Sequence, residues 1–77
     1  MNLLDAAIGV RLVLESVPDQ ETGRLGAHGL CVGRELSVEQ DAPLAGPRIV
    51  RVGLRRLSVP RSVAATLSVR EIGAEVG

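Results

Sequence analysis

The chain contains no Phe, Tyr or Trp, so any core that it forms must be built from aliphatic side chains. Val and Leu supply most of these, with 11 residues each, and only 3 Ile join them. Val is stiff at its branched Cβ and packs well on a pleated sheet, so this composition favours strands over helices. A chain of 77 residues has room for a single core, and we expect one domain spanning residues 1–77.

Short segments of alternating apolar and polar residues, bounded by Gly and Pro, predict five strands. In the first of them, Val10, Leu12 and Leu14 share one face. The expected strands are Val10–Ser16, Arg34–Gln40, Arg48–Val52, Leu54–Val59 and Leu67–Arg70. Five short strands with brief connections predict an all-β fold, a small five-stranded barrel with one or two short helices.

The segment 19–28 predicts a short helix whose N-terminus is capped by the side chain of Asp19. Gly29 suits the left-handed position that follows a helix. This placement makes Leu25 and Leu30 the two residues that contact each other in a Schellman ending.

The connections are predicted from their Pro and Gly residues. Two prolines and a glycine make Asp41–Pro47 a loop, and Gly53 allows a tight turn between two strands. Pro60 suits the first position of a helical turn over Arg61–Thr66. The residues after the last strand, through Gly77, are expected to fray.

The sequence also predicts the cellular compartment of the protein. Cys31 is the one cysteine, so no internal disulfide supports the fold. The N-terminus lacks the basic and long apolar segments of a signal peptide, and no apolar stretch approaches the roughly 20 residues that span a bilayer. We therefore expect a soluble cytoplasmic protein.

Several short pieces within the stretch 24–69 together resemble the FeoA family of ferrous iron transport proteins. The pieces are Arg24-Leu25, Gly29-Leu30, Ala42-Pro43-Leu44-Ala45-Gly46-Pro47, Leu57-Ser58-Val59 and Ala64. The resemblance implies an SH3-like barrel, in whose core we place Leu25, Leu30 and Leu44. It also implies a partner, the membrane transporter FeoB, contacted through its cytoplasmic nucleotide-binding portion.

Few residues offer chemistry. His28 and Cys31 are the only candidates for a thiol–imidazole pair, and no activating arrangement accompanies them. We therefore expect that the protein is not an enzyme. His28, Cys31 and Glu35 are candidate ligands for iron or zinc, which makes a metal-responsive binding module an alternative function. Structural zinc takes four ligands, however, and the position of Cys31 between two apolar residues favours a buried small hydrophobe over a ligand.

The basic residues are all Arg, and five of them fall in one stretch without an intervening acid. They are Arg48, Arg51, Arg55, Arg56 and Arg61. This stretch is interpreted as a solvated face, as a surface for an acidic partner, or as a nucleic-acid site. Single-strand binders stack bases on aromatic rings, and this chain has none and a net charge of zero, which disfavours the third interpretation.

We predict that the five arginines, with Pro43 and Leu44 of the neighbouring loop, contact the transporter. A domain that merely forms homo-oligomers through an aliphatic patch is a further alternative.

Overall fold

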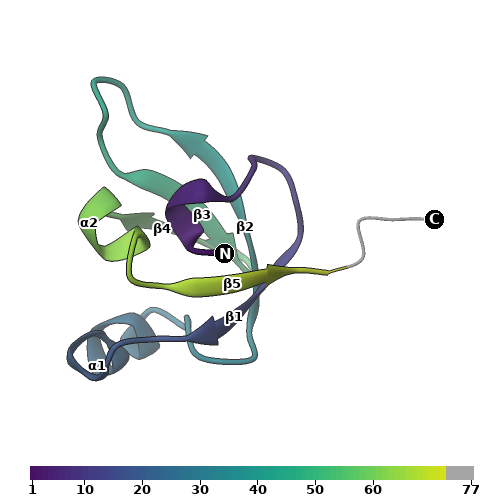
Figure 1. The fold of residues 1–77 in the computed structure, drawn as a ribbon, viewed down its shortest axis with the longest axis vertical. Helices are drawn as coiled ribbons and strands as arrows, with labels where there is room; N and C mark the ends of the chain where they lie inside the picture. Colours follow the sequence, from purple (N-terminus) through teal and green to yellow (C-terminus); the bar gives the residue numbers. More distant parts are fainter. Residues whose placement is uncertain (73–77) are drawn as a thin grey trace.

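One antiparallel sheet of five strands runs through the protein in the order β4-β3-β2-β1-β5 (Figure 1). The structure is a computed structural model, and it describes residues 1–72. In chain order the elements are the 3₁₀ helix η1 (Leu3–Asp5), β1 (Leu12–Ser16), α1 (Asp19–Ala27), β2 (Glu35–Asp41), β3 (Arg48–Val52), β4 (Arg55–Val59), α2 (Arg61–Ala64) and β5 (Ser68–Glu71). This is the all-β fold with short helices that the sequence predicts, and each strand lies close to its expected position.

Strand β2 bends the sheet because its two halves pair with different neighbours. At its start, Leu36 lies opposite Leu12 of β1, and further along Val38 lies opposite Val50 of β3. The register shifts between Val38 and Gln40, where one extra residue is inserted. Such a bulge increases the local twist, and it helps the sheet to curl around a single core.

The core consists of aliphatic side chains from every strand, together with residues of the helices and the N-terminal segment. Its buried members are Leu3, Ala6, Leu12, Leu14, Leu25, Leu30, Leu36, Val38, Val50, Val52, Val59, Ala64, Leu67 and Val69. The predicted inward faces of the second and last strands are confirmed by this list, as are Leu12 and Leu14 of the first, whereas Val10 and Leu57 are only partly buried. Burial of apolar surface is the main stabilising contribution in such a core, and it gains about 25 cal/mol of free energy per Å².

The N-terminal segment covers the outer edge of β5, a role that the sequence pattern does not reveal. The Leu3 N–H donates to the Leu67 carbonyl at 2.9 Å, and the Val69 N–H donates to the Met1 carbonyl at 2.7 Å. Asn2 and Ser68 form a β-bridge between these two contacts. Figure 1 shows η1 lying beside β5 and α2. The backbone of β5 is therefore bonded on both sides.

The opposite end of the sheet is different. Strand β4 pairs with β3 alone, and within residues 1–72 it has no ladder with β5. Complete closure of the barrel would have removed both edges. Instead, β4 leads into Pro60 and α2 before β5 begins, so the curled sheet keeps β4 as an edge strand.

Helix α1 ends as predicted but begins differently. Gly29 has φ +88°, and the Leu30 N–H donates to the Leu25 carbonyl at 3.0 Å, which is the Schellman ending. The prediction that Asp19 caps the N-terminus is wrong, because Pro18 occupies the capping position and no side chain caps it. Asp19 lies inside the first turn, where its negative charge favours the helix dipole.

The β2–β3 loop corrects the prediction that Leu44 fills the core. The Gly46 N–H donates to the Pro43 carbonyl at 3.2 Å across Leu44 and Ala45, whose φ angles are +60° and +57°. Two positive φ angles in the centre of a tight turn define a type I′ turn. This turn points the Leu44 side chain into solvent, where it is 99% exposed.

Two further connections follow the sequence closely. Gly53 has φ +63° and begins a two-residue turn between Val52 and Arg55, which are paired. Pro60 precedes α2 as its capping residue and not, as predicted, as its first helical residue. The expected fraying through Gly77 concerns residues outside those that the structure describes. In residues 1–72, no helix has the length and apolar character needed to cross a membrane.

Candidate interaction surface

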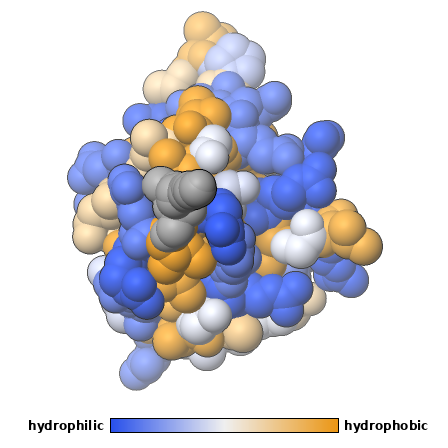
Figure 2. Space-filling view, turned by 90° about the vertical axis from the view of Figure 1, so that its right-hand side faces the viewer, coloured by the Kyte–Doolittle hydropathy of each residue, from blue (hydrophilic) through white to orange (hydrophobic). Residues whose placement is uncertain are grey.

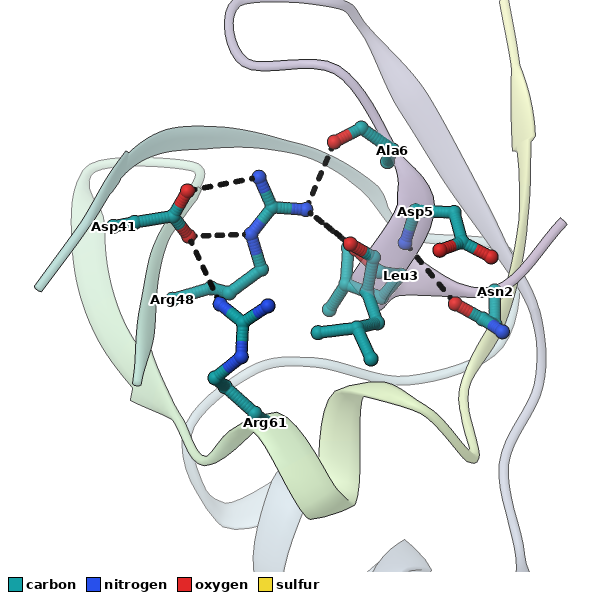
Figure 3. Close-up of polar contacts among 8 residues, drawn as sticks. Asn2, Leu3, Asp5, Ala6, Asp41, Arg48 and Arg61 are labelled. Atoms are coloured by element: carbon teal, nitrogen blue, oxygen red, sulfur yellow. Dashed lines mark hydrogen bonds and ion pairs between the residues drawn. The ribbon is translucent and has the colours of Figure 1, made fainter. Parts of the chain in front are cut away.

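Arg48 is the first residue of β3, and its side chain points into the protein (Figure 3). Only 5% of the residue is exposed. One terminal nitrogen, Nη1, donates to the carbonyls of Leu3, Leu4 and Ala6 at 2.9, 3.0 and 2.8 Å. Arg48 therefore satisfies the carbonyls at the end of η1. Its predicted place on the partner surface is wrong, because a buried guanidinium group cannot reach another protein.

The other side of the Arg48 guanidinium binds Asp41, the last residue of β2. Arg48 Nε donates to Asp41 Oδ1 at 2.6 Å and Nη2 donates to Oδ2 at 3.3 Å, a bidentate pair. Arg61 of α2 approaches the same carboxylate at 3.9 Å. Hydrogen bonding from Arg48 holds the pKa of Asp41 below its usual value. Asp41 thus offsets one of the two positive charges of Arg48 and Arg61.

Arg51 and Arg56 lie opposite each other on the outer face of β3 and β4. Both bind Glu39 of β2, with Arg51 Nε at 2.6 Å from Oε2 and Arg56 Nε at 2.8 Å from Oε1. The hydrogen bond from Arg51 is the main cause that lowers the pKa of Glu39. Two guanidinium groups around one carboxylate leave this face with an excess of one positive charge.

Arg55 differs from the other four arginines because no described residue forms an ion pair or hydrogen bond with its side chain. It is exposed and follows Leu54, whose side chain is 97% exposed at the β3–β4 turn. The guanidinium of Arg34 lies against the same turn, close to Gly53. The end of the β3–β4 hairpin therefore presents cations next to an exposed apolar side chain.

Leu44 and Pro43 lie at the other end of β3 from Arg55. The β2–β3 loop is at the top of Figure 1, and the same upper end of the molecule in Figure 2 has hydrophobic, orange atoms beside pale blue ones. A strand of five residues such as β3 spans about 17 Å. The predicted contact residues thus form two separate surfaces, the Leu44 loop and the β3–β4 hairpin end.

The three predicted metal ligands are not gathered into one site. Among residues 1–72, no group of three or more His, Cys, Asp or Glu side chains could hold an ion. Glu35 is instead bound by Arg11, whose Nε and Nη2 donate to it at 2.8 and 3.2 Å, and this hydrogen bonding lowers its pKa. Cys31 is exposed and His28 follows α1 as its C-terminal capping residue. The interpretation of Cys31 as a buried hydrophobe is therefore wrong.

A groove of about 180 Å³ lies between α1, β4 and α2. Its apolar lining comes from Leu25, Leu57, Val59, Pro60 and Val63. Ser58 and His28 also line it, and the ion pair of Arg24 with Glu21 flanks it at 2.8 Å. Leu57 is an apolar strand residue that is only partly buried because one side of it borders this groove.

The acids that pair with the arginines were visible in the sequence, though their roles were not. Glu39 and Asp41 are two residues apart on β2, directly before the arginines of β3 and β4. In a hairpin, side chains of adjacent strands lie within reach of one another. A strand that ends with Glu39 and Asp41, followed by two strands that carry arginines, is the signal that predicts such pairs.

Comparison with known proteins shows what this arrangement resembles. The family model of the FeoA domain matches residues 1–71. No curated protein sequence is significantly similar to the chain.

Several solved structures share the fold. The FeoA protein of Chlorobium tepidum is 29% identical, with a TM-score of 0.87 over 100% of this chain and 75% of the other. The FeoA of Stenotrophomonas maltophilia, solved with zinc and described as an SH3 domain protein, is 28% identical, with a TM-score of 0.74 over 91% of this chain and 89% of the other. The manganese regulator SloR is 20% identical, with a TM-score of 0.80 over 92% of this chain and 34% of the other. The likeness to the regulator concerns the fold alone.

Proposed function

Because the chain belongs to the FeoA family, we propose that it is a cytoplasmic accessory protein of ferrous iron transport that docks on the cytoplasmic region of a FeoB-type transporter. The family and its structural neighbours support a role in ferrous iron transport. The partner, the compartment and the contact surface are the proposed part. The protein acts on the transporter by binding to it, and it performs no chemistry of its own.

Arg55 is the observation that supports the docking surface most directly. A solvent-exposed cation without an internal carboxylate is available to a carboxylate of another protein, whereas Arg51, Arg56 and Arg61 already share acids of β2. Leu54 beside it offers apolar area that gains free energy when it is buried. Aromatic and Arg anchors dominate many interfaces, and in a chain without aromatic residues Arg takes that part.

Charge reversal tests the proposal. We expect Arg55→Glu combined with Arg56→Glu to weaken binding to the transporter's purified cytoplasmic region by about tenfold or more, measured by calorimetric titration. Arg70→Glu is the matched control, because Arg70 is also exposed but lies on β5 and pairs with Glu15. Equal affinity of the double variant and the control would refute this surface.

A metal-responsive role for this chain has no comparable support, since the described residues do not bring His28, Cys31 and Glu35 together. Zinc was found with the Stenotrophomonas maltophilia protein, and that observation concerns that protein. We therefore propose no required cofactor for the docking function.

A further inference from the structure

We propose that the open edge of β4 accepts an extended acidic segment of the transporter's cytoplasmic region as a sixth strand. This inference rests on the proposed docking function and names its mode of binding. It begins with the backbone groups of β4, which the fold leaves without partners on one side.

The pairing of β3 with β4 determines which groups are free. Residues Val52 and Arg55 flank the two-residue turn, and in such a hairpin the flanking pair exchanges both backbone hydrogen bonds. Because bonded pairs alternate along an antiparallel ladder, Leu57 and Val59 also bond to β3. The N–H and C=O groups of Arg56 and Ser58 point away from β3, in the plane of the sheet and toward its open edge.

The other hairpin agrees with this phase. The Ala42 N–H donates to the Pro47 carbonyl at 2.9 Å, so the next pair, Asp41 and Arg48, is a non-bonded pair. Arg48 must then bond to Val59 of β4, as the first hairpin also requires. Among residues 1–72, no backbone hydrogen bond outside the helices and strands involves Arg56 or Ser58.

The two edges of the sheet are treated differently by the fold. The N-terminal residues cover β5 through backbone hydrogen bonds at 2.9 and 2.7 Å. Nothing in the described chain covers β4 in this way. An open edge is a template for strand addition, and proteins that bind peptides as an added strand use such an edge.

The groove beside β4 provides a place for a side chain of the added strand. Leu57 and Val59 face it from β4, while Leu25 and Val63 face it from the helices. Its volume of about 180 Å³ is below the roughly 300 Å³ or more of typical small-molecule pockets. It suits an apolar side chain that extends from a strand lying along the edge.

The charges select the segment. Side chains of an added strand alternate between the inner face, where the groove lies, and the outer face, where Arg56 and Ser58 lie. A carboxylate on the outer face would meet Arg56, and a carboxylate at the hairpin end of the inner face, beyond the groove, would meet the unpaired Arg55. The segment that fits therefore alternates acidic and apolar residues. A second copy of this chain fits poorly, because pairing two β4 edges places arginines of both copies beside one another.

Amide hydrogen exchange tests the edge directly. In the free protein we expect the amides of Arg56 and Ser58 to exchange fast and those of Leu57 and Val59 slowly. On adding the transporter's cytoplasmic region, the amides of Arg56 and Ser58 should become at least about tenfold more protected. Binding without any protection at these two amides would overturn the inference and leave the docking function standing.

A proline variant tests the same point by mutation. Ser58→Pro removes an N–H that the fold itself does not use, and proline is tolerated on edge strands at such positions. We expect about a tenfold or greater loss of affinity, whereas Ser58→Ala keeps the backbone N–H and binds within about twofold of the wild type. Equal affinity of a folded Ser58→Pro variant would contradict strand addition.

A synthetic probe separates this inference from the proposed partner. A peptide of alternating Glu and Val should protect Arg56 and Ser58 at millimolar concentration, and a peptide of alternating Lys and Val should not. If the transporter's region fails to bind while the acidic peptide protects both amides, the docking function fails and the edge site stands. If neither ligand protects them, the inference is wrong.

Discussion

Arg48 connects the N-terminal segment to the β2–β3 hairpin through both sides of one guanidinium group (Figure 3). Its three carbonyl partners precede it in the chain by 42 to 45 residues. Lys would place a single nitrogen there and could not serve the carboxylate and the carbonyls in the same planar geometry. The residue type is therefore required by its contacts inside the protein.

Arg48→Met should destabilise the protein severely. The substitution leaves the carbonyls of Leu3, Leu4 and Ala6 without their donor, and it removes the partner of Asp41. We expect the free energy of unfolding to fall by about 3 kcal/mol or more, measured by urea denaturation. Arg61→Met removes an exposed arginine 3.9 Å from the same carboxylate and should cost less than about 1 kcal/mol. Similar losses in both variants would contradict this role of Arg48.

Leu44 has a left-handed backbone conformation, which is unfavourable for a residue with a side chain. The left-handed conformation costs a residue with a Cβ about 1 kcal/mol or more, and the 99% exposed side chain recovers none of this by burial. We expect the combined change Leu44→Asn and Ala45→Gly, the preferred pair for a type I′ turn, to raise the free energy of unfolding by about 1–2 kcal/mol.

The same double variant separates the two candidate surfaces. If the transporter also contacts the β2–β3 loop, a more stable protein will bind it more weakly. If docking uses only the β3–β4 end, affinity stays unchanged while the midpoint of urea denaturation rises. An unchanged or lower midpoint would show that the turn is not strained.

At the scale of elements, the glycines in and just after α1 have opposite effects on stability. Gly29 has φ +88° just after the helix, whereas Gly23 and Gly26 lie within it, and a Cβ added at any of the three meets nothing within 4 Å. Any effect of alanine at these positions is therefore due to backbone conformation and not to a steric clash.

Alanine substitutions at these positions should shift stability in opposite directions. Gly29→Ala forces a side chain into the left-handed region and should lower the free energy of unfolding by about 1 kcal/mol. Gly26→Ala, the matched control, should raise it by about 0.5–1 kcal/mol, because alanine has the better helix propensity. Thermal unfolding of the two variants measures the signs, and a stabilising Gly29→Ala would contradict the Schellman ending.

At the scale of the whole molecule, carboxylates of β2 bind arginines from several parts of the chain. Arg11 binds Glu35, while Arg51 and Arg56 bind Glu39. In each case the hydrogen bond from arginine is the main cause of the lowered pKa. These pairs join β2 to the segment before β1 and to β3 and β4, so they act across the curled sheet.

Stability should therefore decrease in acid. A carboxyl group whose pKa is lower in the folded state contributes stability that is fully present above its unfolded value, about 4 for Asp and Glu, and is lost as the pH falls through the folded value. We expect urea midpoints to be level from pH 7 to pH 5 and to decline below that. Glu35→Gln combined with Glu39→Gln should flatten the decline, and an unchanged slope would contradict the contribution of these pairs.

Much of the fold follows from local pattern. The third strand has its predicted bounds, and the Schellman ending and the turn at Gly53 follow from single glycines. These features depend on residues within a few positions of one another, so a single sequence contains the information that specifies them. The resemblance to the FeoA family extended this to the overall architecture, as the family match over residues 1–71 confirms.

What the sequence determined by itself is thus where the strands lie, because alternation and turn residues act locally. Only the tertiary structure decided that Arg48 turns inward, that Leu44 faces solvent, and that the N-terminus covers β5 but leaves β4 open. An arginine in a strand has the same local pattern whether its carboxylate partner is internal or on another protein. Its role depends on contacts between distant segments, and those contacts exist only once the sheet has curled.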